Sequence, residues 1–272
     1  MGPAKRVLVL HDLCTTGKVA LTNIIPVLSV MKINVAPLPT ILLSHPTGGK
    51  TTPIIHSIPI EYIKGCVDQF IQERTVFSAV FIGYLGNTAM VEAAKYLISN
   101  FHDIPIFFDP IMGDGGKYYS NFNVTYKNLL CSLQSSVSIM TPNITELCLL
   151  TDTSYQVNFS KDELMLMCQK LKAPTAVVTG VSMDNRHGVI LWQNQAVEFI
   201  ELDYENSTYH GTGDLFAGVL IGNYLHGHSL AKCIYQAHKF VCDCIQKSKE
   251  LNLDTLEGLA VEQSLSTLLK KI

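Results

Sequence analysis

A glycine-rich segment near the C-terminus combines the residue types that bind a phosphate and move a proton. His210-Gly211-Thr212-Gly213-Asp214 stands directly before residues 215–224, whose apolar spacing predicts an amphipathic helix. Free amide groups and the positive dipole end of a helix start attract an anion, and glycine lets a phosphate approach the backbone. The carboxylate of Asp214 would repel that anion, so an acidic residue here is explained only if the reaction needs a base. Phosphoryl transfer to a hydroxyl needs one. The alternative is that Thr212 or Asp214 only favours the helix start.

A second motif, Thr141-Pro142-Asn143-Ile144-Thr145-Glu146, follows a predicted strand and opens an apolar helical turn. Asn143 and Glu146 stand three residues apart, as the first and last members of a capping box do, so helix initiation alone explains both. The functional interpretation is that the amide and the carboxylate organise a hydrated Mg²⁺ beside nucleotide phosphates, because Mg²⁺ keeps waters and takes few direct carboxylates. Both interpretations stay open.

A third motif, residues 107–116, places Asp109 and Asp114 in a glycine-rich loop after an apolar strand. Asp114-Gly115 has the composition of a simple turn. Asp109 is harder to explain in that way, because it sits where a buried strand ends and Pro110 turns the chain. Thr179-Gly180 is a weaker case of the same kind, with a turn as the default interpretation.

Short β-rich runs alternate with helical patterns, which predicts an α/β fold of parallel strands joined by crossover helices. Ligands of such sheets lie beyond the carboxyl ends of the strands. The sequence places there His11-Asp12, residues 44–49, Gly83-Tyr84, residues 109–114, residues 141–146 and Thr179-Gly180. The predicted strands are 6–10, 34–43, 79–82, 105–109, 136–140 and 176–179, with a hairpin of 188–193 and 196–201. The predicted helices are 60–73, 88–99, 161–171, 215–224, 230–247 and 256–269.

Composition excludes several classes of protein. The 272 residues are 47% hydrophobic and 16% charged, with 20 Lys and Arg against 23 Asp and Glu, so we expect one globular domain over residues 1–272 and no nucleic-acid partner. Apolar runs are interrupted before about 18 residues, and the first one is too short for a secretory signal, which predicts a cytoplasmic protein without a membrane span. The eight scattered cysteines contain no CxxC and are expected to be reduced and mostly buried.

Two segments imitate a phosphate loop but lack its requirements. Gly49-Lys50-Thr51 has Ser44 in place of the earlier glycine, and Gly17-Lys18 has Asp12 there. No GxGxxG follows the first strand, which argues against a dinucleotide site of the Rossmann type. The Gly-, Thr- and Pro-rich segment 44–53 is the one conspicuous insertion, and we expect it to act as a lid.

Taken together, the motifs resemble one known group. Their order and spacing are similar to those of the ribokinase-like superfamily. The motifs are GTGD before a helix, DPxMGD after one strand, TPNxTE after another, residues 83–86, and residues 37–40 leading to Thr47. Within it the chain resembles the pyridoxal (vitamin B6) kinases, from Val7 to about Lys247. The resemblance implies a three-layer α-β-α sandwich with a mainly parallel central sheet.

The same resemblance implies a role for each motif. Asp214 would be the catalytic base and Gly211, Thr212 and Gly213 the anion hole. ATP would be the co-substrate, Mg²⁺ the metal, and a homodimer the assembly, while a monovalent cation such as K⁺ stays open. The Mg²⁺-ATP network would consist of Asp109, Asn143 and Glu146, with Asp109 and Glu146 as metal ligands. The nucleotide would be contacted by Asp114, Tyr118 or Tyr119, Thr141, Thr179 and Gly180. The B6 vitamer would be contacted by Asp12, Thr47 and Tyr84.

Departures from the pattern bear on the substrate. Many pyridoxal kinases have a serine facing the pyridine nitrogen where this chain has Asp12 after His11, a pattern similar to a branch labelled pyridoxamine kinase. Hydroxymethylpyrimidine kinases usually carry Cys where Asp214 stands, which favours a B6 vitamer. We therefore expect ATP-dependent phosphorylation of the 5′-hydroxymethyl group of pyridoxal, pyridoxine or pyridoxamine. The alternatives are a hydroxymethylpyrimidine or other ribokinase-like kinase, a nucleotide-dependent dehydratase of hydrated nicotinamide cofactors, and a silent binding protein, against which the intact acidic residues argue.

Overall fold

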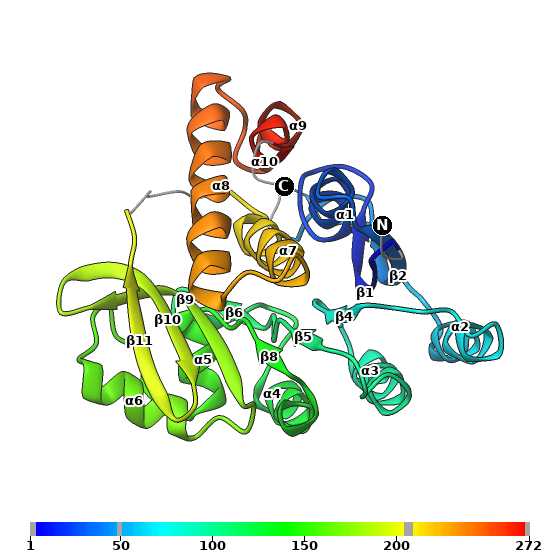
Figure 1. Cartoon of the computed structure of the whole chain (residues 1–272), viewed down its shortest axis with the longest axis horizontal. Coiled ribbons are helices and arrows are strands. Elements are labelled where there is room, and N and C mark those ends of the chain that lie inside the picture. Colours follow the sequence, from blue (N-terminus) through cyan, green and yellow to red (C-terminus); the bar gives the residue numbers. More distant parts are fainter. Residues whose placement is uncertain (1–3, 48–50, 204–208, 270–272) are drawn as a thin grey trace. The chain divides into compact units, whose positions relative to one another are not determined.

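The structure, a computed structural model, describes residues 4–47, 51–203 and 209–269 (Figure 1). These residues form two compact units. Unit 1 joins the N-terminal residues 4–80 to the C-terminal residues 209–269, and unit 2 comprises residues 81–203. The boundary falls within strand β4 (Ala79–Ile82). The prediction of one domain over residues 1–272 remains a prediction.

Unit 1 is built around three neighbouring strands. β1 (Arg6–Cys14) pairs in parallel with β2 (Asn34–Leu43), and β2 pairs in antiparallel with the short β3 (Ile55–Ser57). Residues Val7 to Leu10 are completely buried, as the apolar run predicted. The register between β1 and β2 shifts after His11, because His11 faces Pro39 whereas Leu13 faces Leu42. This β-bulge re-aims the side chains at the carboxyl end of β1.

Helix α7 lies between α1 and α8 in unit 1 (Figure 1). All residues from Asp214 to Asn223 are buried, so the prediction of an amphipathic helix is wrong: neighbours cover α7 on more than one face. Gly222 allows close packing, since a Cβ there would lie 2.4 Å from Sδ of Met31 at the end of α1. The helices of unit 1 are α1 (Leu21–Val30), α2 (Ile60–Gln72), α7 (Thr212–Leu225), α8 (Leu230–Glu250), α9 (Val261–Ser264) and α10 (Ser266–Leu269).

Unit 2 combines a parallel and an antiparallel part. β5, β8 and β9 pair in parallel, and β9, β10 and β11 form an antiparallel meander. The main strands are β5 (Ile106–Phe108), β8 (Ile139–Met140), β9 (Thr175–Met183), β10 (Arg186–Gln193) and β11 (Ala196–Glu201), and β6 (Gly113–Asp114) and β7 (Lys117–Tyr118) form a small separate hairpin. The helices are α3 (Thr88–Asn100), α4 (Val124–Cys131), α5 (Ile144–Leu150) and α6 (Lys161–Gln169), with the 3₁₀ turn η1 (Gln134–Ser136).

The predicted α/β class is confirmed, and the differences have local causes. Helix α1 was missed because Pro26 lies inside it. The single helix predicted for 256–269 is wrong, since only α9 and α10 form there. β9 continues past Thr179-Gly180, so the predicted turn is wrong: the register with β10 slips there, and Gly180 adopts a left-handed φ of 68° within the strand.

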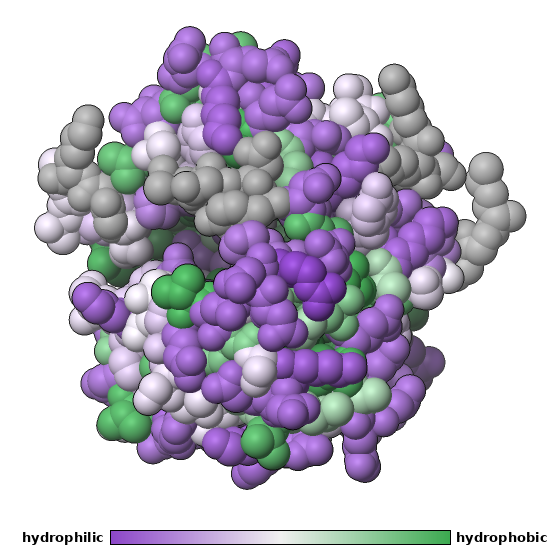
Figure 2. Space-filling view, turned by 90° about the vertical axis from the view of Figure 1, so that its left-hand side faces the viewer, coloured by the Kyte–Doolittle hydropathy of each residue, from purple (hydrophilic) through white to green (hydrophobic). Residues whose placement is uncertain are grey.

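Surface and cysteines agree with the composition. On the face shown in Figure 2, hydrophilic side chains predominate and apolar residues are scattered. Within residues 4–47, 51–203 and 209–269, no helix combines the length and apolar character needed to cross a bilayer. All eight cysteines are free thiols, five of them buried, as expected. Trp192 is buried in the β10–β11 hairpin.

Candidate active site

Asp214 lies in the first turn of α7, and its carboxylate is held by unit 1 at both oxygens. Oδ2 accepts a hydrogen bond from the Ala20 backbone amide at 2.5 Å, and Oδ1 lies 3.2 Å from Nε2 of His11. The side chain is 11% exposed, so the carboxylate is nearly buried but still reaches the surface. A carboxylate has about four lone-pair positions, so these two contacts leave acceptor capacity for a substrate hydroxyl.

The two glycines of the GTGD motif differ in what surrounds them. Gly211, at the N-cap of α7, has a φ of 83°, and a Cβ there would lie 2.2 Å from the Lys18 carbonyl oxygen. Gly213 is exposed, and a Cβ there would meet nothing within 4 Å. Chain packing therefore requires glycine at position 211, whereas the space in front of Gly213 is open. Thr212 between them is half-buried.

Asn23 of helix α1 ties the β1–α1 connection to this loop. Its Nδ2 donates to the carbonyls of Lys18 at 2.8 Å and Gly211 at 3.2 Å, and the residue is completely buried. The loop that begins α7 is therefore fixed by a side chain from the other end of the sequence.

His11 stands between two carboxylates. Its Nδ1 lies 2.7 Å from Oδ1 of Asp12 and its Nε2 3.2 Å from Oδ1 of Asp214, and the ring is 1% exposed. Burial lowers the pKa of His11, but hydrogen bonds to Asp12 and Asp214 outweigh that effect and raise it to about 10. The imidazole is therefore a cation at neutral pH.

The predicted vitamer-contacting residues of unit 1 occupy different settings. Asp12 is buried, and its Oδ2 lies 3.8 Å from the Cys14 sulfur. Burial, followed by the charge of Asp12, raises the pKa of the Cys14 thiol, which stays protonated. Thr47 is exposed, next to residues 48–50 of the predicted lid, which lie outside the described residues. At the ends of the segment predicted as a lid, the Ser44 amide donates to the Ile54 carbonyl at 3.0 Å.

In unit 2 the two central motifs bind each other. Asn143 and Glu146 form the predicted capping box of α5, with the Asn143 amide donating to Oε2 of Glu146 at 2.9 Å. Asn143 Nδ2 also donates to the Gly113 carbonyl, and Oε1 of Glu146 accepts from the Met112 amide. Helix initiation therefore accounts for part of the motif, and the remaining contacts join it to the loop after β5. Burial, and then the charge of the buried Asp109, raises the pKa of Glu146 well above its usual value.

The other predicted nucleotide-contacting residues of unit 2 lie either next to β8 and in β9 or in the β6–β7 hairpin. Thr141 is 5% exposed and directly follows β8, and its hydroxyl has no hydrogen-bond partner among the described residues. Thr179 lies opposite Asn143, since its amide donates to the Pro142 carbonyl, and Gly180 is exposed at the bulge. Asp114 is exposed and its Oδ1 accepts from the Gly115 amide, as in a simple turn, while Tyr118 of β7 is half-buried. The turn interpretation of Asp114 is confirmed.

Tyr84 belongs to an aromatic cluster of unit 2. Its ring lies 5.5 Å from that of Phe122, which stacks at 4.0 Å on Tyr126. Its hydroxyl accepts a hydrogen bond from Asn121 Nδ2 at 2.8 Å. Such a cluster fixes the ring of Tyr84 as a flat surface.

Three contacts that fix predicted site residues in place were not predicted from the sequence. They are made by Asn23, Asn121 and His11. Nothing in the local sequence indicates the first two, because each acts on a residue distant in the chain. His11 was visible only as the neighbour of Asp12 at the end of the first strand.

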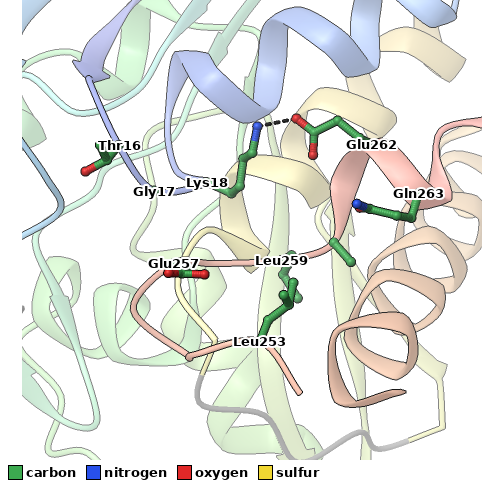
Figure 3. Close-up of a pocket in the computed structure, with 9 residues that line it drawn as sticks. Thr16, Gly17, Lys18, Leu253, Glu257, Leu259, Glu262 and Gln263 are labelled. Carbon is green, nitrogen blue, oxygen red and sulfur yellow. Dashed lines mark hydrogen bonds and ion pairs between the residues drawn. The ribbon is translucent and has the colours of Figure 1, made fainter. Parts of the chain in front are cut away.

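Unit 1 also contains a pocket of about 330 Å³ (Figure 3). An ion pair between Lys18 and Glu262 crosses it, and Leu253 and Leu259 form an apolar part. The pocket borders the GTGD loop through Lys18, whose carbonyl packs against Gly211. Its lining residues are Thr16, Gly17, Lys18, Leu253, Glu257, Leu259, Ala260, Glu262 and Gln263, none of which was predicted as a site residue.

The comparisons with known proteins agree with these motifs. The sequence profile of the phosphomethylpyrimidine kinase family matches residues 35–258. The pyridoxine/pyridoxal/pyridoxamine kinase of Bordetella pertussis is 25% identical over 249 residues, 86% of this chain and 86% of that protein. The crystal structure of pyridoxal kinase from Lactobacillus plantarum covers 98% of this chain and 97% of its own, with a TM-score of 0.88 and 27% identity.

A Bacteroides thetaiotaomicron structure in a crystal form with pyridoxal has a TM-score of 0.89 at 28% identity, covering 97% of this chain and 96% of that one. The profile match extends over most of the sequence, and the structural matches over nearly all of it. The chain therefore belongs to the phosphomethylpyrimidine kinase family, has the ribokinase-like fold, and is an ATP-dependent kinase that phosphorylates an alcohol group of a small molecule.

Proposed function

We propose that this kinase transfers the γ-phosphoryl group of ATP to the 5′-hydroxymethyl group of a B6 vitamer, with Asp214 as the base. The observation that carries the proposal is the Asp214 carboxylate, fixed by Ala20 and His11 in the first turn of α7 beside the open space at Gly213. A base must be held within hydrogen-bond reach of the proton it removes, and this carboxylate is held at both oxygens.

In this mechanism Asp214 accepts the proton of the substrate hydroxyl as its oxygen attacks the γ-phosphorus. A bond forms between that oxygen and phosphorus, the bond to the bridging oxygen of the β-phosphate breaks, and ADP leaves. The free backbone amides at the start of α7 would stabilise charge on the transferred group. Thr141 supports a nucleotide contact, because its buried hydroxyl has no protein partner among the described residues.

Mg²⁺ would be held by Asp109 and Glu146. Both carboxylates are buried, and the pKa of Glu146 is raised first by burial and then by the charge of Asp109. Such a hard oxygen donor set suits a divalent cation. No group of three or more His, Cys, Asp or Glu residues that could hold a metal occurs in the described part of the chain, so water and ATP phosphates would supply the other ligands. Bound there, Mg²⁺ would neutralise negative charge on the phosphates.

The choice of a B6 vitamer over a hydroxymethylpyrimidine rests on Asp214, Asp12 and the similar proteins that act on or were solved with B6 vitamers. Asp12 is a buried carboxylate, which favours a protonated pyridine nitrogen. Hydroxymethylpyrimidine phosphorylation is the second candidate, because the family profile is that of phosphomethylpyrimidine kinases. The dehydratase alternative has no support among these relatives, which are kinases.

A substrate panel tests the proposal. ADP release is measured with pyridoxal, pyridoxine, pyridoxamine and hydroxymethylpyrimidine, each with and without Mg²⁺. We expect the highest kcat/KM with one of the three vitamers and none without Mg²⁺. Asp12→Ser is expected to change the ratios of kcat/KM among the vitamers more than the KM for ATP. Higher kcat/KM with hydroxymethylpyrimidine than with every vitamer would contradict the proposal.

A further inference from the structure

The buried side chain of His11 faces two predicted site residues at once. One carboxylate, Asp12, is its neighbour in the sequence, and the other, Asp214, comes from α7 at the other end of the chain. We propose that His11 is a positioning residue, whose ring fixes the Asp214 carboxylate for proton transfer and links it to Asp12. This inference rests on the proposed function, because it takes Asp214 as the base.

Both ring nitrogens of His11 lie beside a carboxylate oxygen, an arrangement that suits an imidazolium. A carboxylate oxygen lies 2.7 Å from Nδ1 and another 3.2 Å from Nε2, and a neutral imidazole would turn a lone pair toward one of them. The Asp12 amide also donates a hydrogen bond to Nδ1 at 3.0 Å, so this nitrogen contacts both the amide and the closer carboxylate oxygen of the same residue. Among the described residues, the titratable groups that act on this cluster include Asp12, Asp214 and the protonated thiol of Cys14. The raised pKa of His11 agrees with a buried cation.

His11 restricts the rotamer of Asp214. With Oδ2 bound to the Ala20 amide, contact of Oδ1 with His11 leaves the carboxylate one orientation in the first turn of α7. Without His11, the carboxylate keeps one anchor and can rotate about it. A displacement of about 1 Å in a reacting group can lower the rate by about 100-fold.

The backbone of β1 explains why His11 can reach α7. Its register with β2 shifts just after His11, so the end of the strand departs from regular alternation. His11 and Asp12 are adjacent, yet both are buried and turned toward each other. No contact of His11 with the substrate is invoked, so its effect is exerted through Asp214.

A double-mutant cycle tests this inference. kcat and the KM for ATP are measured with the best vitamer for His11→Leu, Asp214→Asn and the double variant, below the Tm of each. We expect His11→Leu to lower kcat by about 10- to 100-fold while the KM for ATP stays within about twofold. In the Asp214→Asn background the same change should lower kcat by less than about twofold, because the group that His11 positions is already lost.

Two further variants control for structural effects. His102→Leu removes another histidine that lies beside an aspartate, Asp103, but on the surface, and it should leave kcat unchanged. His11→Gln, which can donate to one carboxylate, should recover part of the kcat lost in His11→Leu. If His11→Leu does not unfold cooperatively, His11→Gln replaces it in the cycle.

The outcomes separate the two claims. Unchanged kcat in the His11 variant, or equal losses in the wild-type and Asp214→Asn backgrounds, would overturn the role of His11 and leave the proposed function in place. Full activity in Asp214→Asn would instead overturn Asp214 as the base, and the positioning role with it. A loss confined to the background that retains Asp214 supports the inference.

Discussion

At the scale of single residues, charge pairing in a buried place is the central feature. Asp12 and Asp214 are both nearly buried, and two carboxylates so close to one ring would repel each other without a cation between them. The imidazolium of His11 supplies that cation and keeps both acids in fixed positions. We therefore expect removal of the His11 ring to lower both the stability and kcat.

The raised pKa of His11 predicts how stability depends on pH. The folded-state value of about 10 exceeds the ordinary value of 6.5, so the folded protein holds the proton more tightly than the unfolded chain does. The resulting stabilisation is complete below about pH 6.5, declines as pH rises, and is lost above about pH 10. The free energy of unfolding, measured by urea denaturation between pH 6 and 10, should therefore differ between wild type and His11→Gln most at low pH. A difference independent of pH would contradict the assignment.

At the scale of elements, the first turn of α7 carries the proposed base. Its start is fixed by chain packing at Gly211 and Asn23, while the space at Gly213 is left open. The sequence predicted this helix start from glycine, threonine and acid types. It could not predict that α7 is buried from Asp214 onward, because α1, which packs against it, was itself hidden by Pro26.

The two glycines should respond oppositely to alanine. Gly213→Ala should keep or raise the stability, by roughly 0.5–1 kcal/mol, because alanine favours a helix and meets no neighbour. It should nevertheless lower kcat/KM for ATP, since its methyl group enters the space proposed for the phosphate. Gly211→Ala should destabilise the fold by more than about 1 kcal/mol, given its positive φ and the Lys18 carbonyl. Thermal unfolding and steady-state kinetics check both, and unchanged kinetics in Gly213→Ala would count against a phosphate there.

Unit 2 offers a matched pair of capping boxes, Asn143/Glu146 of α5 and Ser160/Glu163 of α6. Asn143→Ala and Ser160→Ala should each cost about 1 kcal/mol of stability, because both remove an N-cap. Only Asn143→Ala should also raise the KM for ATP, since Asn143 joins the loop after β5 to the proposed Mg²⁺ ligands. Denaturation curves and ATP titrations measure the two effects. An equal KM for ATP in the two variants would show that Asn143 acts only as a helix cap.

At the scale of the whole molecule, the sequence predicted what depends on local pattern. The alternation of strands and helices, the two motifs at strand ends and the motif at the start of α7 were all recognisable, and β2 and β4 have the predicted bounds. Contacts between residues far apart in the chain were not predictable, such as Asn23 with Gly211 or His11 with Asp214, because no local pattern encodes them. The strand continuing through Gly180 was missed for a related reason: glycine indicates a turn unless a partner strand accommodates a bulge.

Assembly is a further property at this scale. We propose a homodimer, as the family resemblance implies, so sedimentation equilibrium should give twice the chain mass of 30.0 kDa. A mass of one chain at the concentrations used for kinetics would contradict it.

The most direct test of the central claim is the activity of Asp214→Asn with the preferred vitamer. Asparagine keeps the shape of the side chain but cannot take up the hydroxyl proton, and positioned proton transfer typically contributes about 10²- to 10⁴-fold. We predict a loss of at least about 100-fold in kcat with an unchanged fold, checked by circular dichroism. A smaller loss in a correctly folded variant would show that Asp214 is not the base.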